Sequence, residues 1–446
     1  MTSSSIAVWK IFWKFLLWAN ALFILFFWYR GSGSLLGSDV SGALIALGRV
    51  TGLVAAYMIL LQFVFMSRLP WLERVFGLDN LSRVHQKNGK WAFVFLVLHP
   101  LLITLGYASV GGHGFWEQVA LFFTDFEHVF LAFIGLLLFV VMISTSIAIA
   151  RSRLRYEAWY FVHLVAYAAV FLSFLHQREI GEDIIGNYVF YTYWSIIFAA
   201  VFVNHLVFRF GRPIWLFFRN DFRVARVVRE SPTTVSLYIT GRHLDNFSIR
   251  PGQFMIFRFF MKGLWWQAHP FSMSMVPNGR EIRITVKELG DFTMQLKNVN
   301  QGTRVLIDGP HGIFTDLFSM SDKILLIAGG IGITPIRSLM EEMVKKGKDV
   351  VLLYGNRTEE EIVFREEIDE LRRNFPTAVT HILSHASDFA GEKGIIDEEK
   401  VTRLVPDYLS REVFLCGPPP MMNGLIAVFK KLGVPRHMVH YERFAF

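Results

Sequence analysis

The sequence predicts a membrane protein of several domains, in which six transmembrane helices precede an antiparallel β-barrel and a doubly wound α/β domain. Three observations indicate this. Of the 446 residues, 53% are hydrophobic and 15% are aromatic, more than an ordinary soluble enzyme carries. Long apolar runs fill the chain up to about residue 218, after which apolar and polar residues alternate as in half-buried strands. Near residue 329 an apolar run meets a glycine-rich turn and an amphipathic stretch, the pattern of an α/β unit.

Six apolar stretches each approach the roughly 20 residues that are needed to cross ~30 Å of hydrocarbon. An even number of spans places both ends of the chain on one side. Lys and Arg gather at the N-terminus, in the second and fourth loops and after the last span, whereas the other loops carry mostly Asp and Glu. By the positive-inside rule both termini are therefore cytoplasmic. The spans are expected at residues 11–29, 41–66, 86–106, 128–150, 158–177 and 188–209.

The formal net charge of +8 follows from this distribution of basic residues. Basic loops mark the cytoplasmic side and attract anionic lipid, so the charge does not indicate a nucleic-acid partner. Cys416 is the only cysteine, which excludes an intrachain disulfide and a cysteine-cluster metal site.

Two of the predicted spans each carry two histidines: His85 and His99 in the third span, and His163 and His176 in the fifth. Along a helix, spacings of 14 and 13 residues place the two histidines of each span about 20 Å apart. The four imidazoles therefore lie at two depths in the membrane. Neutral imidazole binds haem iron without carrying charge into lipid. The spacing predicts two haem b groups, an inner one held by the first histidine of each span and an outer one held by the second. Single histidines of this kind more often make helix-packing hydrogen bonds, but two matched pairs favour haem.

The helical phase of the fifth span is a difficulty for this interpretation. At 100° per residue, His99 lies within about 40° of the face of His85, but His176 lies about 140° from the face of His163. The fifth span must then be bent, or must meet the two haems from different flanks. Pro100 can bend the third span in a similar way.

The remainder of the chain predicts two soluble domains after a membrane domain at 1–215. Short strand patterns at 220–318 include HPFS, VKELGDFT and DGPHGIF and indicate a small antiparallel barrel. Residues 322–446 contain KILLIAGGIGITP, VVLLYGNRTEEE and VFLCGPPPMM, three strand–loop–helix patterns that indicate a doubly wound sheet. A glycine turn at the start of a helix is how backbone N–H groups hold a nucleotide pyrophosphate.

With these motifs in this order, the chain resembles the NADPH oxidase and ferric reductase superfamily. In that family a six-helix haem domain is fused to a dehydrogenase of the ferredoxin-reductase type. The resemblance covers nearly the whole chain, and the two histidine spacings are closest to those of NADPH oxidases. It implies FAD, NADPH and two haem b groups as cofactors. It also implies electron transfer from cytoplasmic NADPH, through FAD and the haems, to oxygen outside, which becomes superoxide.

The resemblance assigns the FAD site to the HPFS motif and to the VKELGDFT segment. It implies that HPFS lines the isoalloxazine ring, with Ser272 near the reactive nitrogen, and that the second segment holds the FAD pyrophosphate. Lys287 stands where the family often has Arg, which keeps the charge but loses bidentate geometry. The implied FAD residues are His269, Pro270, Phe271, Ser272, Ser274, Lys287, Gly290 and Thr293.

The resemblance also assigns the NADPH site. The GGIGITP turn is expected to hold the NADPH pyrophosphate, and the CGPPP loop to lie at the nicotinamide, where Cys416 would orient the hydride-donating ring. By spacing alone Cys416 is as well explained as a small buried residue that ends a strand. The implied NADPH residues are Gly329, Gly330, Gly332, Thr334, Pro335, Cys416, Gly417 and Pro418.

Two further residues are expected to touch the cofactors. Arg357, just past a strand end, is placed to bind the 2′-phosphate that distinguishes NADPH from NADH, although it could pair with the acidic run Glu359–Glu361 at the surface. The C-terminal Phe446 stands where the family often stacks an aromatic ring on the flavin, and would have to be displaced by nicotinamide. A frayed chain end is the alternative for this residue.

Fewer residues bear on the identity of the terminal electron acceptor. Arg49 resembles an arginine that NADPH oxidases place beside the outer haem, where it could hold a propionate or attract superoxide; the alternative is an arginine that snorkels to the interface. Family oxidases often carry a histidine four residues after the outer ligand of the third span, whereas this chain has Ile103. Ferric-chelate reduction is therefore the second interpretation.

A third interpretation, of a different class, is a nucleotide-regulated channel or transporter, which leaves the four histidines unexplained. No calcium-binding or adaptor-binding segment is visible in the N-terminal residues, so activity without an obligatory cytosolic activator is expected.

Overall fold

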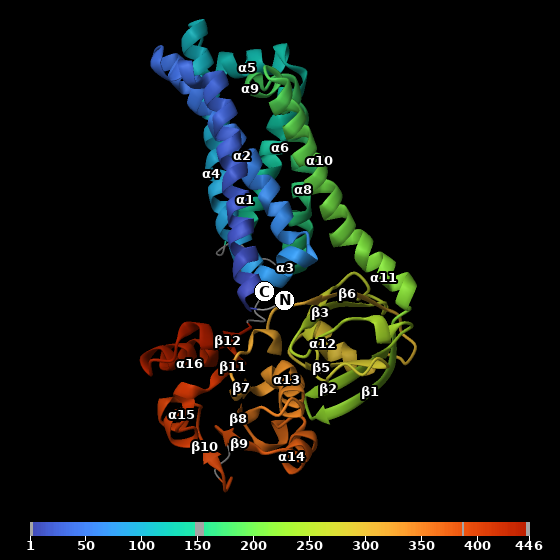
Figure 1. Cartoon of the computed structure of the whole chain (residues 1–446). Coiled ribbons are helices and arrows are strands. Elements are labelled where there is room, and N and C mark those ends of the chain that lie inside the picture. The colour runs from blue at the N-terminus through green and yellow to red at the C-terminus, as the bar shows by residue number, and fades with distance from the viewer. Residues whose placement is uncertain (1–2, 148–155, 386–387, 443–446) are drawn as a thin grey trace. The chain divides into compact units, whose positions relative to one another are not determined.

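The computed structural model describes residues 3–147, 156–385 and 388–442 (Figure 1). The chain divides into two compact units. One comprises Trp9–Arg68 and Leu81–Leu206, and is called the membrane unit below. The other comprises Met1–Val8, Leu69–Asn80 and Val207–Phe446, and is called the reductase unit.

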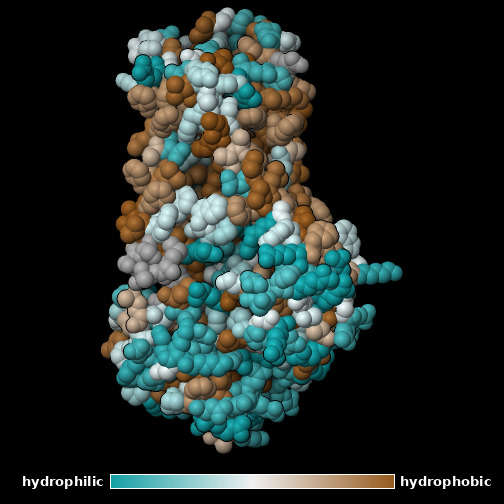
Figure 2. Space-filling view, turned by 45° about the vertical axis from the view of Figure 1, so that its right-hand side comes forward, coloured by the Kyte–Doolittle hydropathy of each residue, from teal (hydrophilic) through white to brown (hydrophobic). Residues whose placement is uncertain are grey.

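Within the described residues, six helices are long and apolar enough to cross a membrane, as the hydropathy predicts. On the face shown in Figure 2, hydrophobic side chains cover the outside of these helices. The third helix begins earlier than predicted, because the polar stretch before His85 is also helical. The basic residues at 151–155 lie outside the described residues. The long helices are α1 (Ser3–Ser32), α2 (Val40–Met66), α4 (Leu78–Gly111), α6 (Glu127–Ser146), α8 (Tyr156–Glu179) and α10 (Tyr188–Leu206).

Short helices connect these spans. Two of them, α5 (Phe115–Asp125) and α9 (Glu182–Ile185), join successive spans within the membrane unit. A third, α3 (Pro70–Phe76), follows the second span in the chain but belongs to the reductase unit. After α10, a π-helical turn at Val207–Gly211 leads to α11 (Arg212–Asn220).

Glycines bring α2 and α4 close together. A Cβ atom at Gly48 would lie 2.8 Å from the Ile103 side chain, and one at Gly52 would lie 2.6 Å from Nδ1 of His99. Small residues at four-residue spacing let membrane helices approach through their backbones. The sequence GRVTG therefore allows α2 to pack directly against the histidine-bearing helix α4.

The first part of the reductase unit is an antiparallel barrel, as predicted. Its two sheets have the orders β1-β2-β5 and β4-β3-β6, and isolated bridges at Arg223–Arg304 and Met273–Ile284 connect them. Inward-facing apolar side chains fill the interior, among them Leu237, Phe257 and Ile284. The strands are β1 (Arg223–Ser231), β2 (Thr234–Thr240), β3 (Phe254–Phe259), β4 (His269–Ser272), β5 (Glu281–Lys287) and β6 (Val305–His311), with helix α12 (Asp291–Gln295) after β5.

The second part is a six-stranded parallel sheet of order β10-β9-β8-β7-β11-β12. Its central strands are the near-continuous apolar runs that a sheet covered on both faces requires. Helices α13 and α16 each contribute apolar side chains to one of its two cores. The strands are β7 (Lys323–Gly329), β8 (Asp349–Asn356), β9 (Thr377–Leu383), β10 (Glu392–Lys393), β11 (Glu412–Cys416) and β12 (Val439–Tyr441). The helices are α13 (Ile333–Lys345), α14 (Arg365–Asn374), α15 (Glu398–Leu404) and α16 (Pro419–Lys431).

The strand order reverses between β7 and β11, since the chain passes from β7 outward through β8 to β10 and then returns to β11. Ligands of doubly wound sheets bind at the carboxyl ends of the strands at this switch point. The glycine turn after β7 and the CGPPP loop after β11 both lie there. The fold class predicted from the sequence is therefore confirmed.

Candidate functional site

The four histidines of the third and fifth spans meet in two pairs between α4 and α8. The ring centres of His85 and His163 are 6.1 Å apart, and those of His99 and His176 are 6.3 Å apart. A metal–imidazole nitrogen bond is about 2.0–2.1 Å long, so the centres of two imidazoles on opposite sides of one metal ion are about 6 Å apart. Both pairs fit that arrangement.

The pairing holds although the helical phase of α8 separates His163 from His176. Helix α8 runs from Tyr156 to Glu179 without interruption, and α4 continues helically through Pro100. Within the described residues, no group of three or more His, Cys, Asp or Glu side chains could hold a metal ion. Two-residue sites suit haem, because the macrocycle supplies the other ligands of the iron.

A backbone contact orients His99 of the outer pair. Nδ1 of His99 lies 2.8 Å from the carbonyl oxygen of Gly48. Since a carbonyl only accepts, Nδ1 carries the proton and donates it, which leaves the lone pair on Nε2 for a metal. Gly52 provides the space for this ring. Helix α2 thus sets the tautomer and the orientation of a side chain on α4.

Arg49 is not a solitary interface cation. Its guanidinium pairs with Glu182 of α9, and it donates to Tyr107 at 3.1 Å and to Ser32 at 3.2 Å. The Ser32 hydroxyl in turn donates to the buried carboxylate of Asp183 at 2.7 Å. Two carboxylates therefore accompany the single positive charge of Arg49.

The HPFS motif forms β4, which pairs antiparallel with β3. The His269 ring stacks on Phe292 of α12 with 3.9 Å between ring centres, and its Nε2 lies 3.0 Å from Gln267. Ser272 is buried at the end of the strand. Ser274 follows β4 and is fully buried. Its hydroxyl and carbonyl oxygens accept hydrogen bonds from Arg283.

The predicted pyrophosphate segment begins α12. The Thr293 hydroxyl accepts from the backbone N–H groups of Leu289 and Gly290, each at 3.0 Å. Lys287 ends β5 and lies 3.4 Å from Glu361 of the α/β domain. The HPFS strand β4 and the start of α12 are thus separate elements of the barrel. They meet where Phe292 stacks on His269.

The glycine turn after β7 packs against the end of β11. A Cβ atom at Gly332 would lie 2.4 Å from the carbonyl oxygen of Cys416, and one at Gly329 would lie 2.4 Å from the sulfur of Met421. Gly330 has a φ of +51°, a left-handed conformation that glycine adopts without steric cost. The hydroxyl of Thr334 donates to the carbonyl of Ile331 at 3.0 Å and stabilises the start of α13.

Cys416 is free and buried at the end of β11. Burial, together with the neighbouring Glu442 carboxyl, raises the pKa of the Cys416 thiol well above its usual value. The thiol is therefore protonated at neutral pH and is not a nucleophile.

Sequence reasoning missed Glu442, which follows β12 and is buried. Burial and the nearby Asp79 and Glu73 raise the pKa of the Glu442 carboxyl well above its usual value. In the sequence, the only feature that could have drawn attention to Glu442 is its position directly after the last short strand. Phe446, four residues later, lies outside the described residues.

Arg357 follows β8 and is exposed. Two residues of the acidic run Glu359–Glu361 pair with other cations, Glu359 with Arg365 and Glu361 with Lys287. The Arg357 carbonyl accepts from the backbone N–H of His385 at 2.8 Å, which ties this turn to the end of β9.

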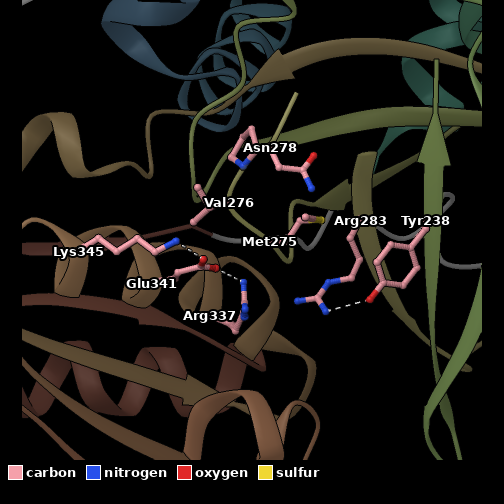
Figure 3. A pocket seen from close by; sticks show the side chains of 9 residues that line it. Tyr238, Met275, Val276, Asn278, Arg283, Arg337, Glu341 and Lys345 are labelled. Atoms are coloured by element: carbon pink, nitrogen blue, oxygen red, sulfur yellow. Dashed lines mark hydrogen bonds and ion pairs between the residues drawn. The ribbon is translucent and has the colours of Figure 1, made fainter. Parts of the chain in front are cut away.

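A cavity of about 300 Å³ lies between the barrel and α13, and Figure 3 shows the side chains that line it. Arg283 of the barrel and Arg337 of α13 both bond to Glu367 of α14, at 2.6 Å and 2.7 Å. Of the predicted cofactor-binding residues that the structure describes, none lines this cavity. Its lining residues Arg283 and Arg337 connect the barrel to the α/β domain through Glu367. The cofactor motifs lie elsewhere.

Three known protein families match successive parts of the chain. The ferric reductase like transmembrane component matches residues 51–174, the FAD-binding domain matches 220–315, and the oxidoreductase NAD-binding domain matches 326–426.

Known proteins resemble about half of the chain. The chain is 28% identical over 242 residues, 52% of its length, to the glycine betaine monooxygenase reductase subunit of Chromohalobacter salexigens. It is 30% identical over 230 residues, 50% of its length, to the ferredoxin reductase component of 3-ketosteroid-9-alpha-monooxygenase of Rhodococcus rhodochrous. The matches span 65% and 64% of those two proteins. The FAD/NAD-binding domain of nitric oxide dioxygenase from Vibrio cholerae has a TM-score of 0.46 at 24% identity, covering 50% of this chain and 97% of that one.

The glycine turn gives a direct test of the NAD-binding site. Gly332→Ala is expected to weaken NADPH and NADH binding alike, because the added methyl group would push the turn away from the Cys416 carbonyl. Equilibrium titration of the purified protein with each nucleotide measures this. Gly424→Ala on α16 is the matched control, since a Cβ atom there meets nothing within 4 Å. Equal affinities for the two variants would contradict the assignment.

The three family matches follow one another along the chain in the order of the observed domains. Apolar helices come first, then the barrel that carries HPFS, then the parallel sheet that carries the glycine turn. The chain thus joins a ferric reductase like transmembrane component to an FAD-binding domain and an oxidoreductase NAD-binding domain. The chain has the domain architecture of the NADPH oxidase and ferric reductase superfamily.

Proposed function

We propose that this protein carries electrons from cytoplasmic NADPH, through FAD and two haem b groups, to oxygen on the other side of the membrane, producing superoxide. The observation that carries the proposal is the presence of two histidine pairs, with ring centres 6.1 Å and 6.3 Å apart, inside the ferric-reductase-like unit. The distribution of Lys and Arg among the loops supports cytoplasmic termini.

The cofactors divide the chemistry: FAD takes up two electrons as a hydride and releases them singly, and haem iron carries one at a time. The chain's own residues position these groups. His85 with His163, and His99 with His176, would hold the irons, and the Gly48 carbonyl keeps Nε2 of His99 available. The reaction balances as one NADPH and two oxygen molecules giving NADP⁺, one proton and two superoxide ions.

The charges around Arg49 favour oxygen over an anionic ferric chelate. Glu182 neutralises the Arg49 guanidinium, and the buried Asp183 lies in the same hydrogen-bonded group. An anionic chelate would need uncompensated positive charge at its docking site, whereas neutral oxygen does not. Ferric-chelate reduction is the second candidate, because the family model that matches residues 51–174 is named for ferric reductases.

The terminal acceptor can be tested with the purified protein loaded with FAD and haem. NADPH oxidation is measured with oxygen, or anaerobically with ferric citrate, and superoxide is detected by a reaction that superoxide dismutase suppresses. We expect superoxide at two molecules per NADPH, with slower ferric reduction. Faster ferric reduction without superoxide would favour the second candidate. A reduced-minus-oxidised spectrum without haem b bands would instead favour the channel or transporter interpretation.

The histidine pairs predict a selective loss of one haem. His99→Ala or His176→Ala should remove the outer haem, while the inner haem and flavin reduction by NADPH remain, because each pair lies at its own depth along α4 and α8. Haem content by pyridine haemochrome and anaerobic flavin bleaching measure this. His113→Ala, outside both pairs, is the control. Loss of both haems from either outer variant would contradict the pairing.

Arg357 predicts the choice of nucleotide. Arg357→Ala should raise the KM for NADPH about 10- to 100-fold and leave that for NADH nearly unchanged, since a hydrogen bond to a charged group contributes about 1.5–3 kcal/mol. Steady-state kinetics with both nucleotides measures the ratio. Arg365→Ala, an exposed arginine paired with Glu359, is the matched control. An unchanged ratio would place the 2′-phosphate elsewhere.

A further inference from the structure

Helix α3 follows the second span in the chain, yet it packs as part of the reductase unit. Pro70 stands in its first turn, where the missing N–H costs nothing. Leu72 and Val75 are buried beside Glu73, so the helix turns one face inward. The loop between the second and third spans is thus a structural component of the reductase unit.

Glu73 makes the polar contacts of this helix. One carboxylate oxygen accepts from the backbone N–H of Gly312 at 2.9 Å, and the other lies 2.9 Å from Nδ1 of His311. The second ring nitrogen of His311 lies 3.4 Å from Asp308. The side chains of Glu73, His311 and Asp308 are 8%, 1% and 4% exposed. Burial of this kind is tolerated only when the charges are paired.

The residues around this group make the contact specific. Gly312 has a φ of +94°, and a Cβ atom there would lie 2.8 Å from Glu442. Arg212 at the start of α11 adds positive charge near Glu73, whereas Asp79 and Glu442 add acidic groups. Few other side chains could replace a carboxylate that accepts from a backbone N–H and an imidazole at once.

His311, which contacts Glu73, ends β6, and only strand β3 separates β6 from the HPFS strand β4. In the β4-β3-β6 sheet, Phe254 is the direct partner of His311 on one side and of Ser272 on the other. Directly opposed residues share a face of the sheet, and all three are buried. A displacement at the end of β6 therefore passes through one side chain to the HPFS strand.

Glu73 is also close in the chain to a predicted haem ligand. Helix α4 begins two residues after α3 ends, and His85 follows Glu73 by twelve residues. Only the short connection at Gly77 separates the two helices. A contact that holds α3 therefore restrains the start of the helix that bears His85.

We propose that Glu73 is a positioning residue that clamps α3 to the His311–Gly312 end of the FAD barrel and thereby sets the passage of electrons from FAD to the inner haem. This rests on the proposed function for its electron path. Electron transfer slows steeply with the separation of the two cofactors, whereas hydride transfer from NADPH to FAD takes place within the reductase unit. The clamp should therefore affect the first of these steps and spare the second.

The test uses the full chain with Glu73→Gln and Glu73→Ala, and Glu370→Gln, an exposed carboxylate of α14, as control. Anaerobic stopped-flow absorbance follows flavin reduction and haem reduction separately after mixing with NADPH. We expect flavin reduction close to the wild-type rate and haem reduction slowed severalfold, because a loosened α3 leaves the start of α4 less well held. Haem reduction at the wild-type rate, or an equal slowing of both steps, would overturn the proposal.

Amide hydrogen exchange of the full-length protein with its cofactors bound supplies a readout that is independent of activity. Segments 70–80 and 308–314 should both exchange faster in the Glu73 variants and remain as in the wild type in Glu370→Gln. Unchanged exchange in either segment would overturn the clamp. If the wild type reduces its flavin but never its haem, the proposed function fails, and hydrogen exchange alone still decides whether Glu73 joins the two segments.

Discussion

A helix that crosses a bilayer must satisfy its polar side chains within the protein, because hydrocarbon offers them no partner. This constraint organises the membrane unit. Arg49 is surrounded by Glu182, Tyr107 and Ser32, and Nδ1 of His99 donates to a backbone carbonyl of the neighbouring helix. The imidazoles of α4 and α8 face one another in pairs at a spacing that a metal ion fits.

In the reductase unit, close backbone approaches and polar pairs both hold the elements together. Gly332 lies against the Cys416 carbonyl, and this contact brings the turn after β7 to the loop after β11. The barrel and the parallel sheet are then joined by side chains, chiefly Arg283 and Arg337 on the single carboxylate of Glu367. Arg283 is buried, and removing the carboxylate that pairs with it would leave an uncompensated buried charge.

The reductase unit includes a segment that lies between two membrane spans in the sequence. Helix α3 lies between spans in the sequence but contributes Glu73 to the buried group of the barrel. A loop of this kind does more than connect two spans, since its position is determined by the flavin domain. The barrel thereby restrains α3 and the first residues of α4 up to Asn80, which belong to the same unit.

The sequence by itself determined the features that depend on local pattern. Hydropathy over about 20 residues located six spans, alternation located the barrel strands, and the order of the glycine motifs indicated the parallel sheet. Local pattern also identified the histidines and their depth in the helices, because rise per residue is constant.

Only the tertiary structure decided which side chains meet. The spacing from His163 to His176 argued against a common face, yet both rings find partners on α4. Sequence could not show that Ser274 is bonded to Arg283 inside the barrel, nor that Glu73 reaches residues more than 200 positions away. Such contacts depend on how whole elements pack. Packing is set by the sum of many weak and distant interactions, which periodicity along the chain does not record.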